Sequence, residues 1–182
     1  MTNLRVVILA AGKGKRMKSK LPKVLHPVCG VPMVQYVLDA AREVSSTKPL
    51  VVVGYKGEEV AGALGDQAEY VWQTEQLGTG HAVKIACSGL EAFTGDLLVL
   101  YGDTPLVTAA TLQQLITRHK QEGAAVTLLS TEVEDPGGYG RILRDRDQRV
   151  TGIVEEGEAS PEEKAIKEVN TGIYCFRFSD LS

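Results

Sequence analysis

Two glycines and a group of basic residues follow the first apolar run of the sequence. Gly12 and Gly14 are separated by one lysine, and Arg16 and Lys23 follow within the next nine residues. Glycines let main-chain N–H groups approach an anion closely, and basic side chains supply charge to phosphate oxygens. The turn is therefore a candidate triphosphate site. A solvated basic turn would show the same pair of glycines.

Two familiar phosphate-binding motifs do not fit this turn. A P-loop requires four residues between its glycines and then Lys-Ser or Lys-Thr, and that spacing is absent here. A dinucleotide fingerprint requires a third glycine where this sequence has Met17. An NAD-binding dehydrogenase is thereby disfavoured.

A single carboxylate follows a second apolar run. The run 97–101 leads into Gly102 and Asp103. In a parallel sheet, this places Asp103 at the same edge as the glycine turn. There it suits Mg²⁺, which takes oxygen ligands from one or two carboxylates and from substrate phosphates. The alternative is an Asp that caps a turn ahead of Pro105.

A polar, glycine-rich loop carries further candidates. Gln73 has both a donor and an acceptor and therefore suits a base edge. Gly78 offers main-chain contacts and Thr79 a hydroxyl at the start of a predicted helix, where Thr79 would equally serve as N-cap. His81 lies in the first turn of that helix. We assign it no chemical role, because a single histidine in such a place is more often structural.

Strands and helices that alternate along the chain must position these residues. Consecutive apolar residues indicate strands buried on both faces, and apolar residues at three- and four-residue spacing indicate helices. The pattern predicts an α/β sheet with right-handed crossovers. Strands are expected over 6–11, 50–53, 70–72, 97–101, 125–129 and 173–176, and helices over 32–44, 58–64, 79–93 and 109–122.

The character of the sequence changes after Asp135. Residues 136–140 form a turn-rich loop, and 141–143 with 150–154 predict a hairpin. Residues 155–167 are charged and are expected to be mobile or helical at the surface. We interpret this as a change of subregion within one domain of 182 residues.

Composition excludes several classes of protein. The formal net charge of −3 gives no reason to expect nucleic acid binding. Three scattered cysteines disfavour a disulfide framework and a zinc site, so reduced thiols in a cytoplasmic protein are expected. No apolar run approaches membrane-spanning length, and the amino terminus lacks the pattern of a secretion signal.

Taken together, the segments resemble the sugar-nucleotide pyrophosphorylase family, and within it the uridyltransferase domain of bacterial bifunctional uridyltransferase/acetyltransferases. They occur in the family's order over nearly the whole chain. They are LAAGKGKRM at 9–17, LPKVL at 21–25, Gln73 with EQLGTGHA at 75–82, YGD at 101–103, GYGRI at 138–142, VE at 154–155 and NTG at 170–172. The resemblance implies a Rossmann-like, mixed but mainly parallel sheet flanked by helices, as in glycosyltransferase-A-like proteins.

The resemblance also implies roles for particular residues. Arg16 stabilises charge in the transition state, Lys23 contacts phosphate, and Asp103 binds Mg²⁺. Tyr101 and Gly102 flank the substrate. The residues implied to bind the nucleotide are Leu9, Ala10, Ala11, Gly12 and Gly14, with Gln73, Gly78 and Thr79 reading the uracil.

Three residues of the second subregion are implied to contact the N-acetylglucosamine unit. They are Gly140, Glu155 and Asn170. From the residues alone, Gly140 would only close a turn, Glu155 would be one of many solvated acids, and Asn170 would cap a strand end.

The implied reaction joins UTP to N-acetylglucosamine 1-phosphate with Mg²⁺, giving UDP-N-acetylglucosamine and pyrophosphate for cell-wall precursors. The chain stops at Ser182, before the family's second metal ligand and before the β-helix that builds a homotrimer and transfers acetyl groups. We therefore expect a truncated domain. Two alternatives stay open: a pyrophosphorylase for another nucleotide or sugar phosphate, and a catalytically silent nucleotide-binding module.

Overall fold

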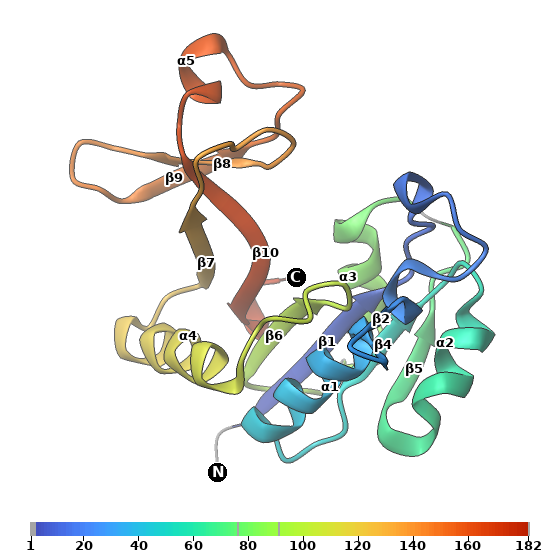
Figure 1. Cartoon of the computed structure of the whole chain (residues 1–182). Helices are drawn as coiled ribbons and strands as arrows, with labels where there is room; N and C mark the ends of the chain where they lie inside the picture. Colours follow the sequence, from blue (N-terminus) through green and yellow to red (C-terminus); the bar gives the residue numbers. More distant parts are fainter. Residues whose placement is uncertain (1–2, 76, 91, 182) are drawn as a thin grey trace. The chain divides into compact units, whose positions relative to one another are not determined.

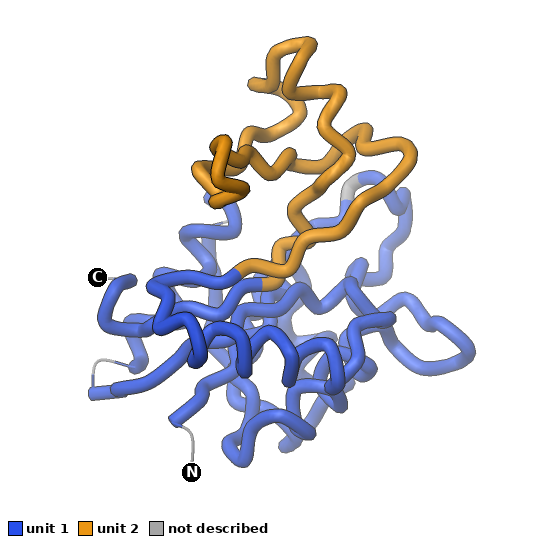
Figure 2. Tube along the Cα trace, turned by 90° about the vertical axis from the view of Figure 1, so that its left-hand side faces the viewer, with its two compact units in different colours: residues 1–127, 174–182 blue, residues 128–173 orange. Residues whose placement is uncertain are grey.

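The computed structural model describes residues 3–75, 77–90 and 92–181. Gln76 of the glycine-rich loop and Glu91 of the predicted helix lie outside the described residues. The chain divides into two compact units, drawn in different colours in Figure 2. Unit 1 comprises residues 1–127 and 174–182, and unit 2 comprises residues 128–173, so the division begins a few residues before Asp135.

Unit 1 is built on a mainly parallel sheet. Its parallel strands are β1 (Leu4–Ala10), β4 (Leu50–Val53), β5 (Glu69–Trp72) and β6 (Asp96–Tyr101), in the order β5-β4-β1-β6. β1 therefore lies between β4 and β6 (Figure 1). The last residues of β10 (Glu168–Arg177) pair antiparallel with β6. The mixed, mainly parallel α/β sheet predicted from the sequence is confirmed.

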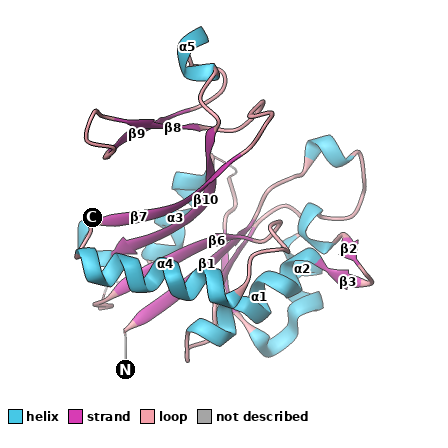
Figure 3. Cartoon of the chain, turned by 60° about the vertical axis from the view of Figure 1, so that its left-hand side comes forward, coloured by secondary structure: helices cyan, strands magenta, loops and turns pink. Residues whose placement is uncertain are grey.

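Helices cover both faces of this sheet, which explains the continuous apolar strands. α1 (Met33–Val44) and α4 (Ala109–Glu122) lie side by side (Figure 3). α3 (Thr79–Cys87) packs on β1 and β4, where its Ala82 and Ala86 join a buried cluster with Val7 and Val52. α2 (Gly57–Leu64) packs on β4.

The predicted helix 79–93 is too long. α3 ends at Cys87, and two successive turns follow, in which Leu90 N donates to Cys87 O and Phe93 N donates to Leu90 O. Gly89 lies within the first turn, where its low helix propensity favours termination. Leu90 packs against the apolar cluster and Phe93 against the ring of Phe178, so packing of these side chains replaces the last helical turns.

A short hairpin was not predicted. β2 (Pro27–Val28) and β3 (Val31–Pro32) pair around Cys29 and Gly30, whose φ angles are 50° and 85°. Two central residues with positive φ are what a tight hairpin turn requires. The sequence signal is weak because each strand has only two residues and both contain proline.

Unit 2 contains the predicted hairpin. β8 (Arg141–Arg144) pairs antiparallel with β9 (Val150–Val154), and Val169 of β10 pairs with Arg141. β7 (Val126–Glu132) pairs with β10. Within the charged stretch, α5 (Pro161–Lys164) begins at a capping box formed by Ser160 and Glu163.

The three cysteines are free. Cys29 is exposed, Cys87 is half-buried and Cys175 is buried. Burial raises the pKa of the Cys175 thiol to about 12, so it stays protonated at neutral pH. Among the described residues, no helix has both the length and the apolar character that crossing a membrane requires.

Candidate functional site

The turn after β1 folds back on itself. Gly14 has a φ of 55°, and Met17 N donates to Gly14 O at 2.9 Å, which closes a short 3-10 turn. A Cβ built on Gly14 would lie 2.7 Å from the Cβ of Lys23. Only glycine therefore lets the chain bring Lys23 against the turn. Arg16 lies in the same turn and is exposed.

Lys23 and Asp103 form an ion pair between Nζ and Oδ2. Their side chains are 37% and 24% exposed, so both charged groups remain accessible to a ligand. The sheet brings them together because β1 and β6 are parallel neighbours, with Leu9 in register with Tyr101. The structure thus places the glycine turn and the carboxylate at one edge of the sheet, as the sequence predicts.

The carboxylate of Asp103 does not cap the turn in front of Pro105. Thr104 closes that turn instead, because its hydroxyl donates to Tyr101 O at 2.7 Å and its N–H donates to the same oxygen at 3.3 Å. The Asp103 side chain is left for Lys23 and for a ligand.

The donor set fits Mg²⁺ through a single carboxylate, with waters and phosphate oxygens as its other ligands. Among the described residues, no cluster of three or more His, Cys, Asp or Glu side chains is suited to a metal ion. Mg²⁺ keeps waters and phosphate oxygens and often takes a single protein carboxylate. Asp103 matches that share of the coordination.

Close packing surrounds Gly102. Its N–H donates to Leu9 O at 2.9 Å, and an added Cβ would lie 3.3 Å from that oxygen and 3.2 Å from a methyl group of Val24. The carbonyl of Ala11 accepts from Tyr55 N at 3.2 Å. The segment predicted to line the nucleotide (Leu9, Ala10, Ala11 and Gly12) is thereby held at the end of β1, with the carbonyls of Leu9 and Ala11 bonded to the protein.

The glycine-rich loop is closed by side chains at its two ends. Gln73, 4% exposed, donates from Nε2 to Gly78 O at 3.2 Å, and the same nitrogen lies 3.1 Å from His81 Nδ1. Gly78, with a φ of 105°, precedes α3. Thr79 is the first helical residue and Gly78 is the N-cap, so the alternative in which Thr79 serves as N-cap is wrong. The cap position has a positive φ, which glycine adopts and threonine does not.

In unit 2, the three residues predicted to contact the sugar converge. Asn170 N donates to Gly140 O at 2.8 Å. A Cβ on Gly140 would lie 3.2 Å from Glu155 Oε1, so the absence of a side chain makes room for that carboxylate. Asn170 Oδ1 accepts from Gly172 N at 2.9 Å within β10, so the strand-end cap expected from the residue alone is wrong.

Arg141 is a residue that the sequence reasoning missed. It is 2% exposed, pairs with Glu156 Oε2 at 2.6 Å, and donates to the carbonyls of Tyr139 and Lys164. It therefore fixes the backbone beside Gly140 and the segment that follows Glu155. The hydrogen bond from Arg141 lowers the pKa of Glu156. An arginine at a strand start gives no sequence signal of burial.

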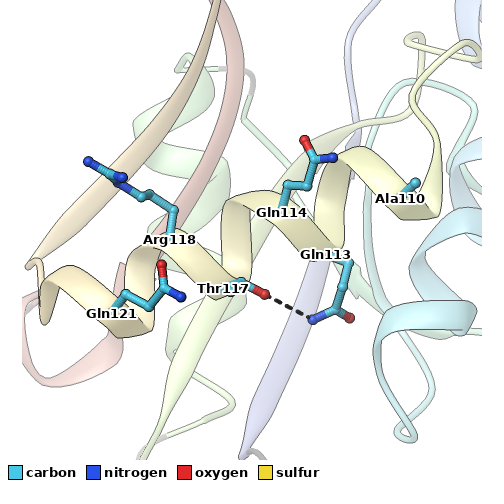
Figure 4. A pocket seen from close by; sticks show the side chains of 6 residues that line it. All are labelled: Ala110, Gln113, Gln114, Thr117, Arg118 and Gln121. Carbon is cyan, nitrogen blue, oxygen red and sulfur yellow. Dashed lines mark hydrogen bonds between the residues drawn. The ribbon is translucent and has the colours of Figure 1, made fainter.

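A shallow hollow on α4 is separate from these residues. Figure 4 shows its lining, in which Gln113 Nε2 donates to Thr117 Oγ1 at 3.4 Å. All of its residues come from the exposed face of one helix, and none is an acid or a histidine. The lining residues are Ala110, Gln113, Gln114, Thr117, Arg118 and Gln121.

A mainly parallel sheet with a basic glycine turn and a lysine-paired carboxylate at the ends of neighbouring strands is the arrangement of a nucleotide-binding α/β protein. The chain belongs to the family described as MobA-like NTP transferase domain, whose model matches residues 6–158.

Curated relatives agree with the motif resemblance, which is thereby confirmed. The chain is 53% identical to a Bifunctional protein GlmU of Bacillus licheniformis over 170 residues. This matched stretch covers 93% of the chain and 37% of that protein. The chain is 53% identical over 179 residues to a Bifunctional protein GlmU of Pelotomaculum thermopropionicum, covering 98% and 39%. The chain thus spans less than two-fifths of the length of these relatives.

Solved structures share the fold. A putative glucose-1-phosphate thymidylyltransferase from Bacillus anthracis superposes with a TM-score of 0.79 at 19% identity, over 97% of the chain and 72% of that protein. HddC from Yersinia pseudotuberculosis superposes with a TM-score of 0.73 at 27% identity, over 96% and 77%.

Proposed function

We propose that the chain transfers a uridylyl group from UTP to N-acetylglucosamine 1-phosphate, giving UDP-N-acetylglucosamine and pyrophosphate. The observation that carries the proposal is the Lys23–Asp103 pair against the Gly14 turn, in a chain 53% identical to GlmU proteins. The likeness to these relatives, together with the motif resemblance, favours this substrate pair over others of the class.

In the proposed reaction, a phosphate oxygen of the sugar phosphate forms a bond to the α-phosphorus of UTP, and the bond from that phosphorus to the β-phosphate oxygen breaks. Pyrophosphate leaves with that electron pair. Such a transfer requires positioning and charge neutralisation and no side-chain nucleophile. Arg16 and Lys23 supply fixed positive charge at the turn.

Asp103 is the proposed protein ligand for Mg²⁺. When bound, Mg²⁺ neutralises charge on the phosphate oxygens and polarises the reacting phosphorus centre. In the unliganded chain, Lys23 neutralises Asp103. We propose that the Lys23 ammonium group moves from Asp103 to a phosphate of UTP when the nucleotide binds. The Asp103 carboxylate would then be neutralised by the metal that it holds, and so it stays neutralised in both states.

The proposed nucleotide contacts lie in unit 1 and the proposed sugar contacts in unit 2. Gln73, Gly78 and Thr79 serve the uracil, and Tyr101 and Gly102 flank the substrate. Gly140, Glu155 and Asn170 serve N-acetylglucosamine, supported by their convergence around the Gly140 backbone. Both chemical ends of the product therefore have candidate residues in this chain.

For the whole protein we propose a cytoplasmic homotrimer that supplies precursors for peptidoglycan and lipopolysaccharide and so supports cell shape. In that protein, the segment beyond this chain holds the second metal ligand, the trimer contacts and the acetyl transfer. The support is the likeness to relatives named Bifunctional protein GlmU, of which this chain matches 37–39%.

Pyrophosphate release tests the proposal. The chain is incubated with Mg²⁺ and each pair of UTP, CTP, GTP or dTTP with N-acetylglucosamine 1-phosphate, glucose 1-phosphate or mannose 1-phosphate. The proposal expects release only with UTP and N-acetylglucosamine 1-phosphate. Release with another pair identifies a different pyrophosphorylase, whereas UTP binding by calorimetry without release from any pair identifies a silent nucleotide-binding module.

A further inference from the structure

The guanidinium group of Arg141 is buried within unit 2, at the start of β8. It donates from Nη1 to Tyr139 O and from Nη2 to Lys164 O, the latter at 3.3 Å. Nη2 also forms an ion pair with Glu156 Oε2 at 2.6 Å. A guanidinium group only donates, so the direction of each of these hydrogen bonds is fixed. One side chain thus joins the loop before β8, the turn after β9 and the end of α5.

The bond to Tyr139 orients the main chain of Gly140. A glycine can offer a ligand only its main-chain groups, and the carbonyl of Gly140 accepts from Asn170 N at 2.8 Å. The N–H of Gly140 belongs to the same peptide as the Tyr139 carbonyl, which accepts from Arg141. That peptide is trans, so its N–H and its carbonyl point in opposite directions. The bond from Arg141 therefore holds the Gly140 N–H on the side that faces away from the guanidinium group.

The ion pair fixes the turn on the other side of Gly140. Glu156 Oε2 also accepts from Gly138 N at 3.4 Å, so its carboxylate links the loop before β8 to the guanidinium group. Glu156 lies in the turn that begins at Glu155, whose carbonyl accepts from two later N–H groups of the turn at 2.9 and 3.0 Å. Glu155 Oε1 would lie 3.2 Å from a Cβ on Gly140. Arg141 thereby holds the turn that carries the Glu155 carboxylate beside Gly140.

Burial of this charge does little for the stability of the fold. The counter-ion Glu156 keeps 40% of its side chain exposed, and Arg141 Nε is buried without a hydrogen-bond partner among the described residues. An apolar residue of similar volume in place of such a buried charge often leaves a protein equally stable or more stable. Stability alone therefore does not require an arginine here, whereas the placement of the Gly140 peptide and of the Glu155 turn does.

We propose that Arg141 is a positioning residue for the sugar unit: it holds the Gly140 main chain and the Glu155 carboxylate in the places from which they contact N-acetylglucosamine. The inference rests on the proposed function, in which these two residues and Asn170 serve the sugar. It adds a buried residue that acts through its neighbours. Arg141 should therefore affect binding of the sugar unit and leave binding of the uridine and the diphosphate unchanged.

Calorimetric binding of UDP-N-acetylglucosamine and of UDP to the full chain with Mg²⁺ tests this inference. The two ligands share the base, the ribose and the diphosphate, so the ratio of their Kd values isolates the sugar unit. Arg141→Met keeps an unbranched apolar stem and removes every donor. We expect UDP-N-acetylglucosamine to bind about tenfold more weakly to this variant, as the loss of one hydrogen bond to the sugar predicts, and UDP to bind within about twofold of the wild type.

Arg144→Met is the matched control on the same strand. It removes the ion pair with Glu168 at the end of β8 that is further from Gly140, and it should leave the ratio of Kd values as in the wild type. Equal losses in the two arginine variants would overturn the inference, because a general loosening of unit 2 would then be the cause. An unchanged ratio in Arg141→Met would also overturn it while the proposed function stands, and so would an equal loss of affinity for both ligands.

Arg141→Lys decides the question if Arg141→Met does not fold. Lysine keeps the positive charge but has a single ammonium group in place of the planar fork that reaches two carbonyls and a carboxylate. We expect the preference for UDP-N-acetylglucosamine over UDP to fall by about threefold or more in this variant, and a preference equal to that of the wild type would reject the inference. A wild-type chain that binds UDP as tightly as UDP-N-acetylglucosamine would instead reject the sugar site of the proposed function itself.

Discussion

The charged groups at the edge of the sheet neutralise each other before any ligand arrives. Asp103 is paired with Lys23, and both side chains keep part of their surface in water. A partly exposed pair of this kind contributes little to folding. In the proposed function, the phosphates and the metal of the substrate offer each partner a stronger contact than the pair itself does.

Asp103→Asn removes the negative charge of the side chain and keeps its size and shape, so this variant tests the role of the charge. We expect pyrophosphate release to fall by about 10²–10³-fold, the scale for removing one electrostatic contact to a transition state, with little change in the free energy of unfolding. Steady-state rates and chemical denaturation measure the two effects. Asp39→Asn, an exposed aspartate on α1, is the matched control. Near-normal release from Asp103→Asn would reject the assigned role.

At the scale of elements, the turn after β1 depends on one of its two glycines. Gly14 has a φ of 55°, and a Cβ there would lie 2.7 Å from Lys23 Cβ, whereas nothing lies within 4 Å of a Cβ on Gly12. We expect Gly14→Ala to lower the free energy of unfolding by about 1–2 kcal/mol and Gly12→Ala to leave it nearly unchanged. Urea denaturation of both variants checks this, and equal losses would contradict it.

The strands of unit 2 are linked by an ion pair that should make them sensitive to acid. Glu168 of β10 accepts from Arg144 of β8 through two bonds of 2.7 Å and from Ser130 of β7 at 2.6 Å. The hydrogen bond from Arg144 is the main cause that lowers the pKa of Glu168 from 4.5. A carboxylate with a lowered pKa stabilises the fold above its unfolded pKa, and this contribution disappears as pH falls through the folded value.

Glu168→Gln should therefore lower the free energy of unfolding at pH 7 by about 1 kcal/mol and flatten its decline below pH 4.5, since the charge that titrates is gone. Chemical denaturation curves recorded between about pH 3 and about pH 7 measure this pH dependence. Glu134→Gln removes the exposed ion pair with Lys167 and should leave the pH dependence as in the wild type. An unchanged acid response in Glu168→Gln would contradict the prediction.

At the scale of the molecule, each compact unit carries a different part of the proposed substrate pair. UTP with Mg²⁺ should slow amide hydrogen exchange in unit 1, over 11–23 and 73–79. The free energy of the opening that permits exchange should rise by up to about 2.7 kcal/mol when the ligand is at about 100 times its Kd. N-acetylglucosamine 1-phosphate should slow exchange in unit 2, around Gly140 and Glu155. Exchange followed by mass spectrometry measures both, and protection confined to the outer face of α4 would point to the hollow there instead.

The sequence by itself determined the sheet of unit 1 and much of the site. Strands buried on both faces are continuous apolar runs, so 50–53 and 97–101 are readable without a structure, as is the helix 109–122 that ends at Gly123. A carboxylate and a glycine turn that both follow parallel strands must share one edge of a sheet. Their proximity was therefore predictable from local patterns.

Only the tertiary structure decided which side chains hold one another. The burial of Arg141, the contact between Gln73 and His81, and the partner of Glu168 each depend on residues from other segments, so a local sequence pattern does not indicate them. The end of α3 was decided in the same way, by packing of Leu90 and Phe93 against distant residues. Periodicity reports which face of an element is buried, whereas polar contacts depend on distances that only the folded chain sets.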